Sequence, residues 1–155
     1  MVLLSWDGEI LEGTAGRHSE FPIHLESLRV RSVVNAVVHT HPPCPVAFAT
    51  TGRPLLALSH EVCHFVPPDI ARFGQTGDLI ATAALGKDLA WYLNDRNAVL
   101  IPHHGMVTVG SDGVGPLQPP HTWSVRVRSR CSLAMMHGQV LMKKPCTSAD
   151  APRVT

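Results

Sequence analysis

The sequence lacks the features that mark several common classes of protein. Its longest apolar runs, such as residues 97–102, are far shorter than the roughly 20 residues that a membrane-spanning helix needs. The N-terminus has no basic stretch ahead of its first apolar residues, so it does not resemble a signal peptide. None of the four cysteines forms a CxxC pair, which excludes a zinc ribbon or a CxxC redox motif. We therefore expect a cytoplasmic protein without membrane segments.

Composition and charge describe a globular protein with an uneven charge distribution. The 155 residues suit a single domain, and 45% of them are apolar while 16% are charged. Residues 1–112 carry 7 Lys/Arg and 11 Asp/Glu, whereas residues 113–155 carry 6 Lys/Arg and only Asp150. The basic residues of this second segment are scattered and accompany no recognised motif. We therefore predict no nucleic-acid partner.

Strand and helix patterns intermix along residues 1–112, which predicts an α/β or α+β fold. The pair Asp7-Gly8 between two short apolar runs favours a hairpin, and Ser19 with Pro22 favours the start of a helix. Leucines at 85, 89 and 93 repeat with helical spacing. The remaining predicted elements are strands at 33–38, 63–66, 97–101 and 106–109, a short helix over 46–49 and a helix over 81–93.

The sequence changes character after residue 112. Pro116, Pro119 and Pro120 interrupt any regular element, and the run from Trp123 to Arg130 alternates valine with arginine without acidic partners. We therefore predict two parts: a folded domain over residues 1–112, and a divergent basic tail over residues 113–155.

Ten histidines are present, and the placement of three of them suggests a metal site. His39 and His41 end a predicted buried strand, where side chains two residues apart point to the same face. A catalytic zinc ion usually takes three protein ligands and leaves one position open. His104 is the best candidate for the third ligand, because it lies at a turn beside Gly105, which allows close backbone approach. An HxH pair also occurs without metal, and His103 and His104 could be ordinary turn residues.

The other histidines fit structural roles better. His24 lies on the predicted helix, where we expect it to be hydrogen-bonded within the domain. No defensible pattern links the rest to a site, and we expect them in loops or on the surface: His18, His60, His64, His121 and His137.

Three segments in order resemble the class II aldolase/adducin family. They are HSEFPIH (residues 18–24), AVVHTHPPCPVAFATTGRPL (residues 36–55) and NAVLIPHHGMVTVG (residues 97–110). The resemblance covers about residues 2–112 and implies an incomplete three-layer α/β/α fold with a mostly antiparallel central sheet. It implies that His39, His41 and His104 bind zinc or another divalent metal, and that Glu20 is the catalytic acid/base. His103 departs from the asparagine that usually precedes this histidine in the family.

The resemblance also implies an activity and partners. It implies a lyase of sugar-phosphate metabolism that acts by retro-aldol cleavage through an ene-diolate, or a related epimerase or decarboxylase, and a homo-oligomeric assembly. The alternative is a non-catalytic member that holds metal or mediates protein interaction, as adducin does. The family's longer N-terminal region, with its glycine-and-asparagine phosphate loop, has no counterpart here, so no residue is assigned to the phosphate.

A frameshift would explain the tail. With freely chosen codons, GPLQPPHTWSVRVRSRC can be back-translated so that another frame reads AAAAAAHLERACQIAL, an amphipathic helix similar to the family's next element. We hypothesise a frameshift near Val114, which the nucleotide sequence of the gene would test.

Overall fold

Helices and strands intermix in the computed structural model, which describes residues 1–57, 62–63, 65–66 and 68–111. The elements are β1 (Leu3–Leu4), β2 (Ile10–Glu12), α1 (Phe21–Val30), β3 (Ala36–Thr40), α2 (Pro43–Thr50), β4 (Ala71–Arg72), α3 (Ala83–Leu93), β5 (Ala98–Ile101) and β6 (Gly105–Gly110).

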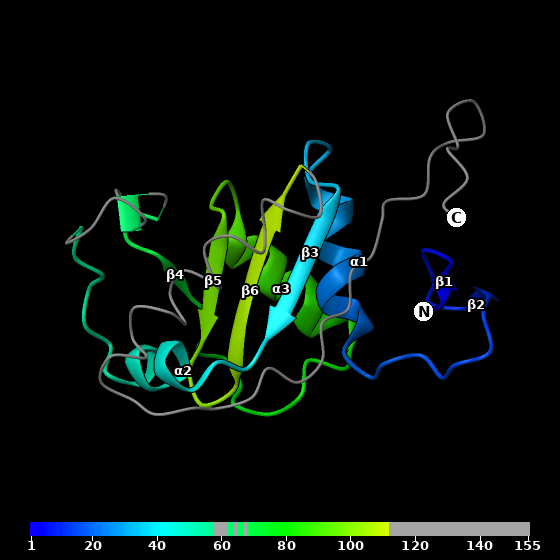
Figure 1. Ribbon diagram of the computed structural model, residues 1–155, viewed down its shortest axis with the longest axis horizontal. Helices are drawn as coiled ribbons and strands as arrows, with labels where there is room; N and C mark the ends of the chain where they lie inside the picture. The colour runs from blue at the N-terminus through cyan, green and yellow to red at the C-terminus, as the bar shows by residue number, and fades with distance from the viewer. Residues whose placement is uncertain (58–61, 64, 67, 112–155) are drawn as a thin grey trace.

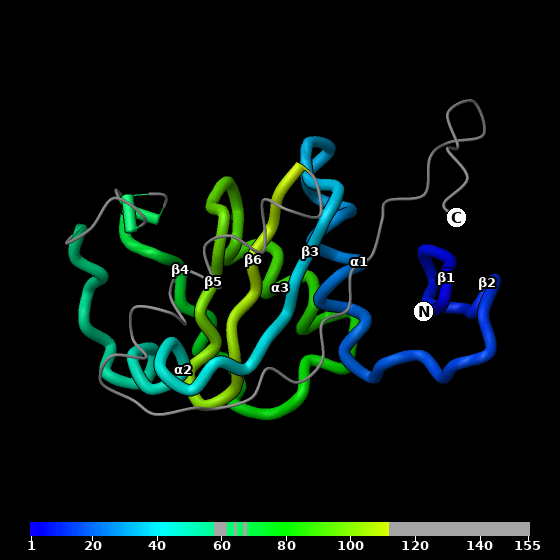
Figure 2. Tube along the Cα trace, in the orientation of Figure 1, coloured from blue at the N-terminus to red at the C-terminus, as the bar shows by residue number. Residues whose placement is uncertain are grey.

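Four strands form a mixed sheet in the order β3-β6-β5-β4 (Figure 1). Strand β6 pairs antiparallel with both β3 and β5, and only β4 and β5 are parallel. The mostly antiparallel sheet that the family resemblance implied is therefore confirmed. The tube in Figure 2 shows how β6 lies directly beside β3, although more than half of the described chain separates them in sequence.

The two faces of the sheet carry different layers. Helices α1 and α3 pack on one face, where Val37, Val99 and Val107 join the larger apolar core. Helix α2 packs on the other face, against Leu100 and Met106. This is the layered α/β/α arrangement that the resemblance implied. The register places His39 opposite Val107, so strand alternation directs His39 to the face that α1 and α3 cover.

The contact between α1 and α3 is close because α3 carries a glycine at the crossing. A Cβ atom added at Gly86 would lie 2.8 Å from the backbone carbonyl oxygen of Pro22. Pro22 itself lies in the first turn of α1, where proline is tolerated. This close crossing fixes the position of the N-terminal end of α1, where Glu20 precedes the helix.

The predicted N-terminal hairpin is confirmed as the antiparallel pair β1 and β2. Gly8 in its turn has φ +83°, a conformation that favours glycine. The Arg17 guanidinium donates to the carbonyl of Gly8, and Arg29 Nη2 donates to the carbonyl of Trp6 at 2.7 Å. Two arginines thereby attach the hairpin turn to the region of α1.

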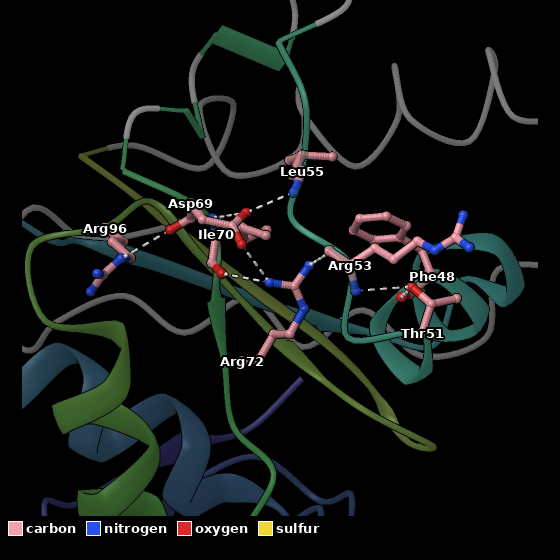
Figure 3. Close-up of polar contacts among 8 residues, drawn as sticks. All are labelled: Phe48, Thr51, Arg53, Leu55, Asp69, Ile70, Arg72 and Arg96. Atoms are coloured by element: carbon pink, nitrogen blue, oxygen red, sulfur yellow. Dashed lines mark hydrogen bonds and ion pairs between the residues drawn. The ribbon is translucent and has the colours of Figure 1, made fainter.

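A second polar contact set holds the long connection between α2 and β4 (Figure 3). Asp69 Oδ1 accepts hydrogen bonds from the backbone amides of Leu55 at 2.9 Å and Ile70 at 2.8 Å. Arg72 Nη1 donates to Asp69 Oδ2 at 2.8 Å, and Arg72 Nη2 donates to the carbonyl of Arg53 at 2.5 Å. We call Asp69, Arg72 and the backbone groups of Arg53, Leu55 and Ile70 the Asp69 clamp. It ties the start of the connection to the strand at its end.

Several predicted elements need correction. Ser19 is not the cap of α1: Glu20 is the N-cap residue, and its side chain makes no capping bond because it points elsewhere. The predicted strand at 63–66 is wrong among its described residues, and the edge strand is β4. The strand predicted over 33–38 lies at Ala36–Thr40, and the short helix over 46–49 begins earlier, at Pro43.

Some predictions fall outside the described residues. They concern the basic tail, its frameshift origin, and His60, His64, His121 and His137. Among the residues that are described, no helix is both long enough and apolar enough to cross a bilayer.

Candidate metal centre

Three elements bring the predicted site residues together. Glu20 immediately precedes α1, His39 lies in β3 and His41 follows that strand, and His104 lies in the turn between β5 and β6. One potential ligand atom from each of the four side chains lies within 4.8 Å of the other three. We call these four residues the His/Glu cluster.

The three imidazole rings of the cluster pack together, with His41 and His104 stacked and His39 edge-on to both. Their centroids are 4.6 to 5.1 Å apart. The Nε2 atoms of His39 and His41 are 3.0 Å apart. Glu20 Oε2 lies 3.5 Å from His39 Nε2, and Glu20 Oε1 lies 3.2 Å from His104 Nε2. The nitrogen and oxygen atoms thus converge on one small volume.

A backbone contact fixes the orientation of the His39 ring. Its Nδ1 atom lies 3.0 Å from the carbonyl oxygen of Met106, which can only accept, so Nδ1 carries the proton. A neutral His39 ring therefore presents a bare Nε2 to the cluster. A metal-ligating histidine commonly donates its second nitrogen to a backbone carbonyl in this way.

The ring of His104 makes no hydrogen bond among the described residues. Its side chain is 7% exposed, and neither ring nitrogen has a hydrogen-bond partner among the described residues, because the close contact with Glu20 lacks hydrogen-bond geometry. An unsatisfied buried polar group costs about 1–3 kcal/mol. A ligand bound to Nε2 would remove part of this cost.

Gly105 makes room for the histidine rings. A Cβ atom there would lie 2.6 Å from His41 Cδ2, 2.6 Å from the carbonyl oxygen of Thr40 and 3.0 Å from His39 Cε1. The sequence prediction that this glycine permits close approach is therefore confirmed. Any side chain at this position would displace two of the converging rings.

Glu20 is a buried carboxylate with its charge compensated by neighbours. The residue is 1% exposed, and its Oε1 accepts a hydrogen bond from the amide of Ile80 at 2.9 Å. Burial raises the pKa of Glu20, but His104, His39 and the Ile80 amide together lower it well below its ordinary value. Burial alone would have favoured a protonated acid, and these three neighbours reverse that tendency.

His41 forms the open side of the cluster. It is the one exposed member, whereas Glu20 and His39 are buried. Burial of part of the ring, followed by the charges of His39 and His104, lowers the pKa of His41. A neutral imidazole at neutral pH is the form that binds a metal.

The residues present fit a divalent cation. Three imidazoles and a carboxylate are the donor types that zinc accepts in catalytic sites, and the exposed position of His41 leaves one side accessible. The oriented His39 ring and the unpartnered nitrogens of His104 are the two observations that favour an ion over a purely structural cluster.

Comparison with known proteins identifies the family. The sequence model of one protein family, the class II aldolase and adducin N-terminal domain, matches residues 1–113. The chain belongs to the class II aldolase and adducin family. Members of this superfamily are metal-dependent aldolases or decarboxylases.

Two relatives and one solved structure illustrate the match. The 5-deoxy-D-ribulose 1-phosphate aldolase of Bacillus thuringiensis serovar kurstaki is 36% identical over 112 residues, which cover 69% of this chain and 49% of the relative. Decarboxylase NovR of Streptomyces niveus is 33% identical over 112 residues, covering 70% of this chain and 40% of the relative. A structure of L-fuculose 1-phosphate aldolase shows the same fold, with a TM-score of 0.68 at 21% identity, covering 83% of this chain and 60% of that one. The chain spans about half the length of the curated relatives.

The turn between β5 and β6 places its two adjacent histidines, His103 and His104, differently. The amide of His104 donates to the carbonyl of Ile101 at 3.1 Å, and His103 has φ +64°. His103 is exposed and is not part of the cluster, whereas His104 is. Of the two imidazoles, His104 is therefore the one that can share an ion with His39 and His41.

Two further groups shape the site without having been found in the sequence. They are the amide of Ile80 and the carbonyl of Met106. Both are backbone groups, which leave no residue-type signal. His24 is buried on α1 outside the His/Glu cluster, and the hydrogen bond expected for it stays a prediction, since its Nδ1 has no partner among the described residues. His18 is exposed, as expected, and its Nδ1 accepts from the Glu20 amide at 3.2 Å.

Proposed function

We propose that this chain is the metal-binding part of a lyase that cleaves a sugar phosphate by a retro-aldol reaction. In this proposal His39, His41 and His104 hold zinc or another divalent cation, and Glu20 is the acid/base. The convergence of their four ligand atoms within 4.8 Å carries the proposal. The family membership supports it, because relatives of similar identity include sugar-phosphate aldolases.

The bound cation would supply Lewis-acid stabilisation for the negative charge of an ene-diolate. Neutral imidazoles suit this task, because they leave the ion its full positive charge. The exposed side of the cluster at His41 would admit the substrate oxygens. His39 would stay fixed by its bond to the Met106 carbonyl while the substrate enters and leaves.

Glu20 would move the proton. As a carboxylate it would accept the proton of the substrate hydroxyl whose carbon–carbon bond breaks, so that an aldehyde forms and the bond electrons pass to the ene-diolate. The protonated Glu20 would then return that proton to the ene-diolate carbon. The Ile80 amide holds one carboxylate oxygen, so the other is better placed to take and release the proton. Burial excludes water, which strengthens these interactions.

The second candidate is a non-catalytic member that retains the cation. The family description supports this candidate, because it names adducin beside the class II aldolases. The two candidates share the ion and differ in turnover. A member of the decarboxylase type would share the cation as well and would release carbon dioxide from a carboxylated substrate.

Zinc content and turnover test the proposal. We expect one equivalent of zinc in the purified protein, its loss in His39→Ala, and zinc-dependent aldehyde release from at least one member of a sugar-phosphate panel. Glu20→Gln should retain the fold and lose turnover, because an amide cannot carry the proton. Zinc without turnover on any substrate would support the non-catalytic candidate, and absence of zinc would reject both.

A further inference from the structure

His18 begins the turn that leads into α1. The amide of Phe21 donates to the carbonyl of His18 at 3.3 Å, which closes a turn over residues 18–21. Glu20 has φ −92° and ψ 23°, close to the values for the third residue of a type I turn. The backbone of Glu20 is therefore set by this turn and not yet by the helix that follows it.

The side chain of His18 makes a second bond inside the turn. Its Nδ1 atom accepts from the Glu20 amide at 3.2 Å. Asparagine, aspartate and serine are favoured at the first position of such turns, because their side chains accept the amide two residues further on. The imidazole of His18 takes this role here. Because Nδ1 accepts, the proton of the neutral ring is on Nε2, which has no hydrogen-bond partner among the described residues.

The turn leaves the start of α1 without a free amide that could attract a carboxylate. A helix start normally has such amides, and an acidic side chain there can cap them. The Phe21 amide is already bonded to the His18 carbonyl, and Pro22 has no N–H. The amide of Ile23 donates to the carbonyl of Glu20 at 3.1 Å. None of these first three helical positions can therefore draw the Glu20 side chain back toward the helix.

The Glu20 carboxylate instead reaches the His/Glu cluster. Its Oε1 atom accepts from the amide of Ile80 at 2.9 Å and lies 3.2 Å from His104 Nε2. Its Oε2 atom lies 3.5 Å from His39 Nε2. The direction of the side chain thus depends on a backbone conformation that the turn at His18 maintains.

We propose that His18 is a positioning residue: by accepting the Glu20 amide through Nδ1, it holds the turn that aims the Glu20 carboxylate at the cluster. This inference rests on the proposed acid/base role of Glu20. His18 itself transfers no proton in this role, and its imidazole acts on the backbone of Glu20 alone.

Three substitutions separate the two nitrogens of the His18 ring. His18→Asn places an amide oxygen near the position of Nδ1 and suits the first position of the turn. His18→Gln places its amide group near the position of Nε2 and loses the Nδ1 acceptor, and His18→Ala removes both. If the ring acted by touching the substrate through Nε2, glutamine would replace it better than asparagine.

Amide hydrogen exchange followed by NMR reads the position of the Glu20 carboxylate without any substrate. The Ile80 amide is 60 residues away in sequence and donates to Glu20 Oε1, so its exchange rate reports the carboxylate and not the turn. We expect this amide to exchange about 5- to 10-fold faster in His18→Ala and His18→Gln, as for the loss of one hydrogen bond, and at the parent's rate in His18→Asn.

The exchange measurement has three controls. The Val109 amide, which donates to the Asn97 carbonyl, should not change, since a general loss of stability would speed its exchange too. Ser19→Ala should leave the Ile80 amide unchanged, because Ser19 is exposed in the same turn and its side chain makes no hydrogen bond among the described residues. In a Glu20→Ala background, His18→Ala should have no further effect on the Ile80 amide.

Turnover should follow the same order as the exchange rates. A displacement of a catalytic group by about 1 Å can cost about 100-fold in rate. We therefore expect kcat to fall about 10- to 100-fold in His18→Ala and His18→Gln and to stay near the parent's value in His18→Asn. Zinc content should be the same in all of them, because the three histidine ligands lie outside the turn.

Two results would overturn the inference alone: an Ile80 amide that keeps the parent's exchange rate in His18→Ala, or a His18→Gln variant that retains more turnover than His18→Asn. A parent chain without turnover on any sugar phosphate would instead reject the proposed function. The exchange of the Ile80 amide would then decide by itself whether His18 positions the carboxylate.

Discussion

The His/Glu cluster and the Asp69 clamp both join distant parts of the chain through polar side chains, but their hydrogen bonding differs. In the clamp, both carboxylate oxygens of Asp69 accept bonds from amides or from a guanidinium, so donors and acceptors match. In the cluster, neither ring nitrogen of His104 has a hydrogen-bond partner among the described residues, and the Nε2 atoms of His39 and His41 lie 3.0 Å apart. The groups of the clamp satisfy one another, whereas the ring nitrogens of His104 remain open to a further ligand, such as the proposed cation.

The largest expected effect of this difference is on zinc-dependent stability. A ligand at about 100 times its dissociation constant stabilises a folded protein by about 2.7 kcal/mol. Thermal denaturation with and without zinc should show a gain of this order for the parent chain and for Asp69→Asn, and a chelator should reverse it. His39→Ala should show none. An equal zinc-induced rise in all three proteins would mean that the ion binds elsewhere.

The next largest effect is expected at Gly105, which lies in close contact with the rings of His39 and His41. Gly105→Ala places a methyl group against the His41 ring and the Thr40 carbonyl. We expect a loss of about 1–3 kcal/mol in the free energy of unfolding, typical of overpacking, together with greatly weakened zinc binding. Gly74→Ala is the control, because a Cβ atom at Gly74 meets nothing within 4 Å and its φ is not left-handed. Denaturant unfolding and zinc titration measure both quantities, and normal zinc binding by Gly105→Ala would contradict the packing argument.

A smaller effect is expected in the clamp, and it should depend on pH. Burial raises the pKa of Asp69, but the Leu55 amide, Arg72 and the Ile70 amide lower it more, so the net shift is downward. The ionised form therefore stabilises the fold above the unfolded pKa of about 3.9, and this stability is lost as pH falls through the folded pKa.

At pH 7 we expect Asp69→Asn to lose about 0.5–1 kcal/mol, a small value because the side chain is 39% exposed. The difference from the parent should shrink below about pH 4. Urea unfolding between pH 7 and about pH 4 measures this difference in the free energy of unfolding. Asp88→Asn, on the exposed side of α3, is the control. A difference that stays constant with pH would show that the charge of Asp69 is not responsible.

The smallest effect is expected in the turn between β5 and β6. His103 has φ +64° and follows Pro102 in a turn closed by the bond from His104 to Ile101, where glycine or asparagine is favoured. The left-handed backbone conformation costs a residue with a Cβ atom about 1–2 kcal/mol, and this cost is smaller for asparagine. His103→Asn should therefore raise stability by up to about 1 kcal/mol, as seen by thermal unfolding. His103→Ala should give no gain, and a gain of equal size with alanine would remove the conformational explanation.

The parts of the site that the sequence could predict are those with a local pattern. Strand geometry alone predicted that His39 and His41, two residues apart at a strand end, would point to the same face. The order of the family motifs selected His104 and Glu20, and the structure places both beside the first two. The same positive φ explains why asparagine is usual where this chain has His103.

The parts that could not be predicted depend on contacts between distant backbone groups. The bond from the Ile80 amide to Glu20 spans 60 residues, and the contact of His39 with the Met106 carbonyl spans 67. Strand β4 has two residues and exists through its pairing with β5, so its own sequence carries little signal. Ser19 looked like a helix cap by type, but the chain places Glu20 at that position and directs its carboxylate into the site.

The register between β3 and β6 has a consequence for how the gene can change. A one-residue insertion or deletion within β3 would turn His39 to the opposite face of the sheet and remove it from Glu20 and His104. The described residues of the connection between α2 and β4 belong to no strand pair, so a change in its length would leave the register of β3 and β6 unchanged. Relatives that diverge in substrate while keeping the ion should therefore differ in length within residues 56–68 and keep a constant count of residues across β3, the β5–β6 turn and β6.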